Sequence, residues 1–361
     1  MAAPTAEPAV PEPAPTTVAA TAGPGWPGTD VAEAIRISRG ELGEPHLPFL
    51  PQLPDRGIGA DAVGRTASLL VDLPVDLQPH GWRLVDRPGR DLARAQALLS
   101  RDLNTLADLA GEEDRPSTGL RLSLLGPLSL AAGLHLHNGE RALVDAGARR
   151  ELAESLAAGL GAYLHRAAEA VPGTRLVLAV EEPDAERVLR GRIPTASGYR
   201  TLRAVPDAEA RRTWQLIRDA AAEAGARTVL VLPGVGRPAD RAAASAADLA
   251  LAAGYDGVGL PAAGLQPRDW ETVARTVEEG RRIELGLVPL PAPAVQVRQV
   301  TALVDSVLRP WRDVGLPLRQ LPALAPVPAA DLAAAPPATA RAVLARLTQT
   351  ASALEQVAAD A

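Results

Sequence analysis

Short apolar runs alternate along the chain with longer stretches rich in alanine, leucine and arginine. Each run has the length of a buried strand and closes at a proline or a glycine. The runs span residues 119–127, 174–183, 227–234, 254–261, 282–289 and 318–326. The stretches between the later runs have the length and composition of helices, at residues 148–170, 207–224, 238–253, 267–280 and 294–311. The pattern therefore predicts strands and helices in alternation.

The apolar runs are continuous, which indicates strands buried on both faces, as in a parallel sheet covered by helices. Two further strand candidates lie upstream, at residues 17–26 and 46–53. Eight strands in a chain of 361 residues fit a (β/α)8 barrel. We therefore predict an α/β protein with one TIM-barrel domain over residues 21–361 and a disordered Ala/Pro-rich tail over residues 1–20.

The predicted tail consists mostly of alanine, proline and threonine, with two glutamates and no basic residue. Such a composition cannot bury a core. The tail also lacks the basic and apolar regions of a secretory signal, which favours a cytoplasmic protein. No apolar run in the chain approaches the ~18 residues of a membrane-spanning helix.

A doubly wound fold is the alternative to the barrel, because Gly23, Gly25 and Gly28 have the spacing of a dinucleotide-binding loop. Pro24 and Pro27 remove backbone N–H groups that a pyrophosphate needs. No helix is predicted to begin within the motif, so the barrel is the favoured architecture.

The amino-acid composition excludes several kinds of functional site and partner. The chain contains no cysteine, which excludes disulfides, thiolate nucleophiles and cysteine-held metal centres. The formal charge is −6, and all 37 basic residues are arginine. Aromatic residues are few, with five Trp, three Tyr and one Phe. Because the arginines are mixed with acidic residues along the predicted helices, we expect neither nucleic acid nor a membrane as a partner.

The most distinctive polar pair follows an apolar run. In a (β/α)8 barrel the active site lies at the carboxyl ends of the strands, and Glu181 and Glu182 end the run at 174–183. Adjacent strand residues point to opposite faces, so one carboxylate faces the barrel axis, where it would bind an amine or act as a base. The other interpretation is that Glu182 caps the following turn while Glu181 pairs with a barrel arginine. The sequence leaves both open.

Two histidines have a spacing found in some zinc sites. His135 and His137 lie well past the apolar run at 119–127, beside Asn138 and Gly139. We therefore expect both to be solvated histidines in a surface turn and not metal ligands.

Several motifs follow one another near the predicted strand ends. They are Gly25–Asp30 with Glu33 and Ala34, Gly59–Arg65, Val71–Pro79 with Gly81–Arg83, Gly126-Pro127, Glu182-Pro183 and Gly191–Gly198. In this order and spacing they resemble the cobalamin-independent methionine synthase family, in particular its single-barrel, C-terminal-domain-like branch in actinobacteria. The resemblance covers nearly the whole chain after residue 20.

The resemblance implies a methyltransferase that moves a methyl group from 5-methyltetrahydropteroyltriglutamate to the sulfur of homocysteine, in methionine biosynthesis. In the family a zinc ion activates the homocysteine thiol. The family's zinc ligands correspond here to Leu232, Gly234, Pro261 and a position near Leu324. None of these side chains binds zinc, so the sequence predicts no metal and no other cofactor.

The resemblance also implies contacts to an amino-acid-like small molecule. The family's aspartate for the substrate amino group corresponds to Glu181, and a serine after the first strand corresponds to Gly25. The implied substrate-binding positions are Glu181, Glu182, Trp26, Asp61 and Arg65.

Three functional hypotheses stay open. The first is a methionine-synthase-like barrel that has lost zinc and keeps a pocket for a small molecule or a partner. The second is a metal-free enzyme that uses a carboxylate such as Glu181, or chemistry similar to that of uroporphyrinogen decarboxylases. The third is an interaction protein that uses the Pro-rich tail and the Ala-rich segment 331–361 as contact elements.

Overall fold

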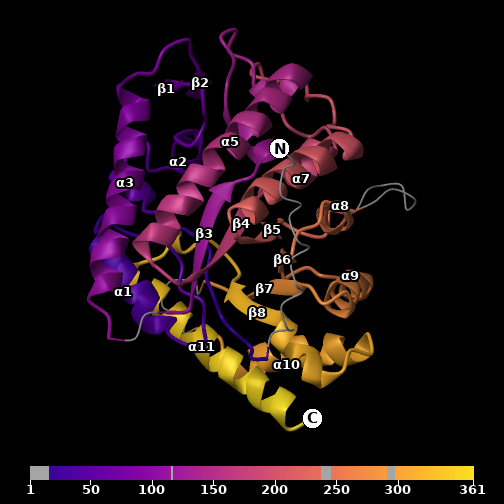
Figure 1. The fold of residues 1–361 in the computed structure, drawn as a ribbon. Coiled ribbons are helices and arrows are strands. Elements are labelled where there is room, and N and C mark those ends of the chain that lie inside the picture. The colour runs from indigo at the N-terminus through magenta and orange to yellow at the C-terminus, as the bar shows by residue number, and fades with distance from the viewer. Residues whose placement is uncertain (1–15, 115–116, 237–244, 291–296) are drawn as a thin grey trace, which may run out of the picture.

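A six-stranded parallel sheet covered by helices forms the centre of the protein (Figure 1). The structure is a computed structural model, and it describes residues 16–114, 117–236, 245–290 and 297–361. The strands are β1 (Val75–Gln78), β2 (Gly81–Leu84), β3 (Gly119–Leu125), β4 (Arg175–Glu181), β5 (Arg227–Val231), β6 (Gly257–Pro261), β7 (Arg282–Val288) and β8 (Leu324–Pro328). The central sheet has the order β3-β4-β5-β6-β7-β8, and β1 and β2 form a separate antiparallel pair.

Helices alternate with the strands and surround the sheet. They are α1 (Val31–Glu41), α2 (Ala62–Ala67), α3 (Arg90–Gly111), α4 (Pro127–Gly133), α5 (Ala146–Ala170), α6 (Ala185–Leu189), α7 (Asp207–Glu223), α8 (Ala246–Ala252), α9 (Pro267–Glu278), α10 (Val300–Asp313) and α11 (Pro337–Ala359). Short 3-10 turns occur at Pro54–Arg56, Ala142–Val144, Leu318–Ala323 and Leu332–Ala334. No helix within the described ranges is long and apolar enough to cross a lipid bilayer.

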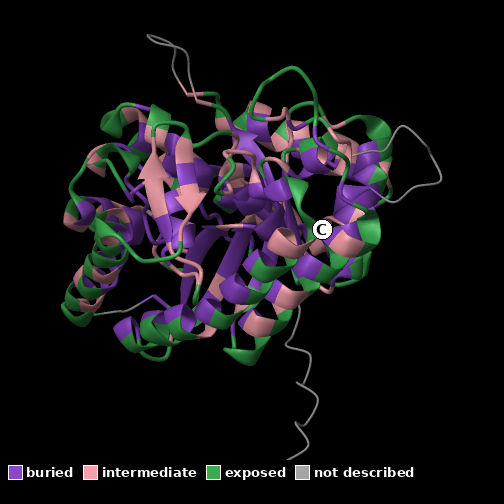
Figure 2. Cartoon of the chain, turned by 90° about the horizontal axis from the view of Figure 1, so that it is seen from above, coloured by how far each residue is buried: buried purple, intermediate pink, exposed green. Residues whose placement is uncertain are grey.

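The helices pack on the sheet through one apolar face each. In α3, for example, Leu99, Leu103 and Leu106 recur at helical spacing and are buried. Figure 2 shows the result, with buried residues concentrated on the strands and on the inner sides of the helices. The alternating α/β pattern predicted from the apolar runs is thus confirmed for β3 to β8.

The sheet curls so that distant strands face one another. Arg121 on β3 contacts Glu284 on β7 at 3.0 Å between Nη2 and Oε2, although β4, β5 and β6 lie between these strands in the sheet. Alternate residues point inward, which places Arg121, Glu181 and Glu284 on the concave side.

Two extended segments, residues 19–26 and 46–52, connect the two edges of the sheet. Thr21 N donates to Pro326 O of β8 at 3.1 Å, and Leu50 N donates to Arg121 O of β3 at 2.9 Å. The two segments also bond to each other, through Trp26 N to Gln52 O at 2.8 Å. Both segments were predicted as strands, but their pairing consists of isolated β-bridges. Prolines 24, 48 and 51 have no backbone N–H to donate, so a continuous ladder does not form.

Some predicted boundaries differ from the structure. The run at 318–326 is a 3-10 turn up to residue 323, and the strand begins at Leu324, since Pro322 supplies no N–H to a ladder. The β1–β2 pair was not predicted, because each strand has only four residues. Helix α8 starts after Ser245, which caps it, and the predicted helical residues 238–244 lie outside the described residues.

The predicted tail, residues 1–20, overlaps the predicted strand at 17–26. The structure buries Val18 and Ala20, so the packed chain has begun by residue 18. Residues 1–15 lie outside the described residues.

Candidate functional site

A cavity of about 500 Å³ opens at the carboxyl ends of the central strands. In parallel α/β proteins this end of the sheet is where ligands bind. Its walls are mostly apolar, and residues that line it include Leu124, Leu125, Pro183, Val231, Leu232, Pro233, Leu260, Pro261, Val327, Ala329 and Ala330. Its polar side chains are Gln52, Arg121, Glu181, Glu284 and Asp331.

The floor of the cavity is a buried cluster of one arginine and two glutamates. Arg121 Nη2 lies 3.2 Å from Glu181 Oε1 and 3.0 Å from Glu284 Oε2. Its Nη1 donates to Ala22 O at 2.9 Å and to Ser123 Oγ at 3.0 Å. The side chains of Arg121 and Glu284 are each 2% exposed, whereas Glu181 is 20% exposed. Glu181 is thus the member of the cluster that a molecule in the cavity can reach.

The electrostatics of this cluster favour a positively charged ligand. Burial raises the pKa of the Glu181 carboxyl, the nearby Glu284 raises it further, and Arg121 opposes both effects. Burial alone would lower the pKa of Arg121, but Glu284 and Glu181 outweigh it and the pKa is raised. Arg121 therefore stays charged. One cation against two glutamates, with Asp331 at the rim, leaves the described lining with an excess of negative charge.

Glu182 points to the opposite side of the strand and is fully buried. Its Oε1 accepts from Leu128 N at 3.0 Å and from Trp214 Nε1 at 2.8 Å, and its Oε2 accepts from Ser129 N at 2.8 Å and Ser129 Oγ at 2.6 Å. The carboxylate thereby supplies the N-terminal acceptor of α4 that its glycine cap, Gly126, cannot supply. Burial raises the pKa of Glu182, while the bonds from Ser129, Trp214 and Leu128 lower it.

The structure pairs Glu181 with Arg121, as the second interpretation predicted. That interpretation was wrong about the element that Glu182 caps, because its carboxylate caps α4, which precedes β4 in the chain, and not the turn that follows Glu182. The structure adds that Glu181 keeps its contact with the cavity while it pairs with Arg121. The alternation of a strand explains the division of roles, because one side chain faces the concave side and the next faces the helices.

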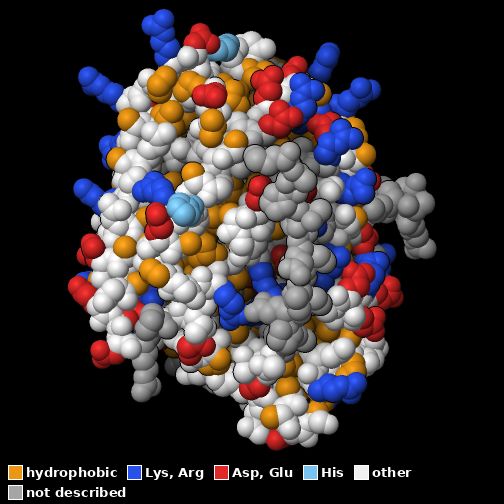
Figure 3. All heavy atoms as spheres, viewed as in Figure 1, with side chains coloured by type: hydrophobic (Ala, Val, Ile, Leu, Met, Phe, Trp, Pro, Cys, Tyr) orange, Lys and Arg blue, Asp and Glu red, His pale blue; other side chains and the backbone are white. Residues whose placement is uncertain are grey.

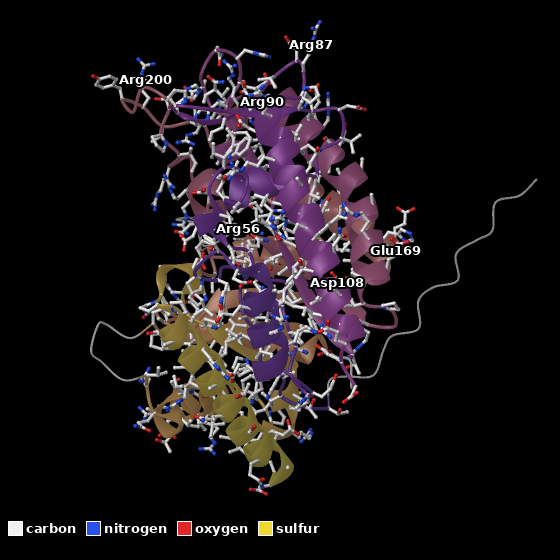
Figure 4. The ribbon with its side chains drawn as sticks, turned by 90° about the vertical axis from the view of Figure 1, so that its left-hand side faces the viewer. Arg56, Arg87, Arg90, Asp108, Glu169 and Arg200 are labelled. Atoms are coloured by element: carbon white, nitrogen blue, oxygen red, sulfur yellow. The ribbon has the colours of Figure 1, made fainter. Side chains whose placement is uncertain are left out.

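The other predicted substrate positions lie away from the cavity lining. Asp61 caps α2 by accepting from Gly64 N at 2.9 Å, and it also accepts from Trp82 Nε1. Arg65 is buried and contacts Asp102 of α3, which also binds Arg56 at 2.6 Å. Figure 4 labels Arg56 beside α3. Trp26 is buried, with its ring 6.2 Å from that of Phe49.

Two residues that sequence reasoning passed over, Arg121 and Glu284, dominate the floor. Both are charged residues in the interior of mostly apolar strands, and both side chains face the concave side of the sheet. A buried charge destabilises the fold unless it is paired, so a charged residue inside an apolar strand predicts a charged partner nearby. This pattern could have identified both residues from the sequence.

The histidine prediction is wrong for His135. This residue is buried and its Nδ1 lies 3.2 Å from Trp82 O, with its ring edge-on to His80. The reason is that residue 135 bridges to Arg83 of β2, a strand that was not predicted. His137 is exposed, as expected.

The positions that correspond to the family's zinc ligands do not fit a zinc ion. Leu232 and Pro261 line the cavity with apolar side chains, and the chain has no cysteine. Strand β8 ends at Pro328, beyond Leu324, and the residues at that end are Ala329 and Ala330. Within the described ranges, no three His, Asp or Glu side chains converge as a metal site would require.

Comparison with known proteins yields a likeness in fold alone. No model of a known protein family matches the sequence. No curated protein matches it either. Among solved structures, a B12-independent methionine synthase from Shewanella sp. W3-18-1, in complex with selenomethionine, is similar with a TM-score of 0.56 and 11% identity, covering 95% of this chain and 98% of that one.

Two further solved structures show weaker likeness. A putative phosphonomutase from Burkholderia cenocepacia J2315 has a TM-score of 0.31 and 14% identity over 64% of this chain and 70% of that one. The IOLI protein with a bound zinc atom has a TM-score of 0.34 and 12% identity over 73% of this chain and 84% of that one. These two likenesses are too weak to carry an argument, and the likeness to the methionine synthase shows a similar fold.

Proposed function

We propose that this protein binds a small organic amine, without a metal ion, in the cavity at the carboxyl ends of its strands. The ligand carries a protonated amino group on an apolar body, as amino acids with apolar side chains and their esters do. The observation that carries the proposal is the partly exposed Glu181 carboxylate in a negatively charged floor beneath apolar walls. An ammonium group would contact Glu181, and the apolar body would bury its surface against leucine, valine and proline side chains.

The fold supports a ligand of this class. The similar methionine synthase was solved with selenomethionine, an amino acid with an apolar side chain. We further infer that the segments 19–26 and 46–52 take the places of the first two strands of an eight-stranded barrel, because their hydrogen bonds join β8 to β3.

Methyl transfer to homocysteine by the family's zinc chemistry is not supported, since the positions for the ligands are Leu232, Gly234, Pro261 and a position near Leu324, in a chain without cysteine. A decarboxylase acting on an acidic substrate is also not favoured. Such a substrate would need several cations, and the described lining offers Arg121, which two glutamates already hold. The binding of an amine requires no group that the cavity lacks.

The test is calorimetric titration with three probes of similar size: L-methionine methyl ester, L-methionine and hexanoate. The proposal expects affinity to fall in that order, from cation to zwitterion to anion. Glu181→Gln should weaken binding of the ester about tenfold, or ~1.4 kcal/mol, because a neutral amide replaces the carboxylate. The matched control is Glu169→Gln, on the outer side of α5, where Figure 4 labels Glu169.

Hexanoate binding more tightly than the ester would refute the proposal. So would an ester affinity that Glu181→Gln leaves unchanged. Added zinc or a chelator should not alter the ester affinity in either protein.

A further inference from the structure

The charges that line the cavity at the carboxyl ends of the strands do not balance. Its described lining contains three carboxylates but a single guanidinium group, that of Arg121. The carboxylates are those of Glu181, Glu284 and Asp331. On the face drawn in Figure 3, by contrast, acidic and basic side chains are interspersed. A ligand with one ammonium group would leave part of the negative excess uncompensated, so the lining favours a ligand with two positive charges.

One unused acceptor lies at the floor of the cavity. Glu284 is 2% exposed and its Oε2 binds Arg121, but its Oε1 is buried without a hydrogen-bond partner among the described residues. Buried acceptors are normally paired, so this oxygen indicates a donor that a ligand supplies. Glu181 and Glu284 both contact Nη2 of Arg121, at 3.2 Å and 3.0 Å. One primary ammonium group, which has three N–H donors, can therefore serve both carboxylates.

Asp331 places a further carboxylate at the mouth of the cavity. The residue is exposed, and its Oδ1 accepts from Ala333 N at 2.9 Å, which caps the 3-10 turn Leu332–Ala334. Its Oδ2 takes no part in this cap, and Asp331 forms no ion pair within the described ranges. Its side chain occupies the space that a Cβ on Gly25 would take. A cation at the mouth would thus meet a negative charge that no described cation already holds.

The segment 19–26 relates the floor to the mouth. Ala22 O accepts from Arg121 Nη1 at the floor, at 2.9 Å, and Gly25 lies against Asp331 at the mouth. Three residues of extended backbone span at most about 10 Å. With C–C bonds of about 1.5 Å and angles near 111°, a chain of four to six methylene groups holds two amino groups roughly 6–9 Å apart. An alkyl chain of this length fits between the two acidic ends and suits the apolar walls.

We propose that the ligand of this cavity is an α,ω-diamine with a chain of about four to six carbons. One ammonium group donates to Glu181 and Glu284 at the floor, the chain lies against the apolar walls, and the other ammonium group pairs with Asp331 at the mouth. This inference rests on the proposed binding of an amine. It adds the second charge of the ligand and the residue that recognises it.

Calorimetric titration with three probes tests the second charge. Hexamethylenediamine, aminohexanol and aminohexanoate share one primary ammonium group and an alkyl chain, and their other end is positive, neutral and negative. The diamine should bind about four- to tenfold more tightly than the amino alcohol, by a factor of about two because either end can enter and otherwise through an exposed ion pair. Aminohexanoate should bind more weakly than the amino alcohol, because its carboxylate would face Asp331.

Asp331→Asn removes the charge at the mouth and keeps the cap, since asparagine also caps helical turns. It should lower the ratio of diamine to amino-alcohol affinity to about two, because the exposed ion pair is lost, and it should raise the affinity for aminohexanoate. A merely structural defect would not shift the two affinities in opposite directions. The matched control is Asp145→Asn, because Asp145 is exposed, caps α5 through Ala148 N at 2.8 Å and lies outside the cavity lining. This control should keep the wild-type ratio.

The outcomes separate this inference from the proposed function. A wild-type ratio of about two, which the two equivalent ends alone explain, would overturn the diamine as ligand. A larger ratio that Asp331→Asn leaves unchanged would also overturn it. In both cases amine binding that Glu181→Gln weakens would still support the proposed function. If none of the three probes binds, both proposals fail.

Discussion

Replacing Glu182 by glutamine removes a single acceptor oxygen from a fully buried side chain beside the cavity. The two oxygens of Glu182 accept four hydrogen bonds, from Leu128 N, Trp214 Nε1, Ser129 N and Ser129 Oγ. A glutamine keeps one oxygen and turns an NH2 group toward the other two donors. The less damaging orientation faces Ser129, whose hydroxyl can rotate to accept, but the backbone N–H of Ser129 still loses its partner.

The expected cost of Glu182→Gln follows from these contacts. A buried donor left without a partner costs about 1–3 kcal/mol. The remaining bonds lose the charge of the acceptor, and charge-assisted bonds are about twice as strong as neutral ones. The neutral glutamine avoids the cost of burying a charge, as the raised pKa of Glu182 indicates, so part of the lost free energy of unfolding is recovered. We expect a net loss of about 2–4 kcal/mol in the free energy of unfolding, from a total that is typically about 5–15 kcal/mol.

The assay is urea unfolding at pH 7 followed by far-ultraviolet circular dichroism, since Trp214 contacts the mutated group and its fluorescence would report the mutation itself. Glu181→Gln is the matched control, with the same chemical change one residue away. A glutamine at 181 can still accept from Arg121, so its loss should stay below about 1 kcal/mol. A Glu182→Gln protein within about 0.5 kcal/mol of wild type, well inside the cost of one buried unpaired donor, would refute the capping argument.

Three further predictions concern the cavity. The pKa of Glu181 is raised above its ordinary value of 4.5, so its contribution to the free energy of unfolding is fully present below pH 4.5 and is lost as the pH rises through the raised pKa. The stability advantage of wild type over Glu181→Gln should therefore be largest near pH 4 and shrink toward pH 7. A stability difference that grows with pH would contradict this. Arg121→Met leaves Glu181 and Glu284 buried without their cation and should cost about 3–5 kcal/mol in urea unfolding, whereas adding Glu181→Gln and Glu284→Gln should restore most of the loss. In Gly25→Ala, the new Cβ would lie 1.6 Å from Oδ1 of Asp331, which must leave its cap position. The loss should be about 1 kcal/mol in wild type and close to zero in an Asp331→Ala background, so equal losses in both backgrounds would exclude this contact as the cause.

The apolar runs predicted the sheet correctly where each strand is buried on both faces. From β3 to β7 the predicted runs contain the observed strands, because continuous apolar residues closed by proline or glycine suit a strand covered by helices. The prediction lost accuracy where proline lies within the run. Prolines interrupt the hydrogen-bonded ladders of residues 19–26 and 46–52, and β8 begins only after Pro322. A residue without an N–H weakens strand pairing, and the pattern of apolar residues does not show this loss.

Some features of the candidate site could be predicted from the local sequence, and others depend on residues that are distant along the chain. The sequence alone indicated that the end of β4 belongs to the candidate site. It also excluded zinc bound by cysteine, because the chain contains no cysteine in any conformation. The division of roles between Glu181 and Glu182 required their partners. Arg121 and Glu284 reach Glu181 only because the sheet curls, and Trp214 reaches Glu182 only because α7 packs behind β4. A carboxylate's pKa and its access to a ligand depend on such neighbours, which are distant along the chain, and so the folded arrangement alone assigns one glutamate to the cavity and the other to the cap.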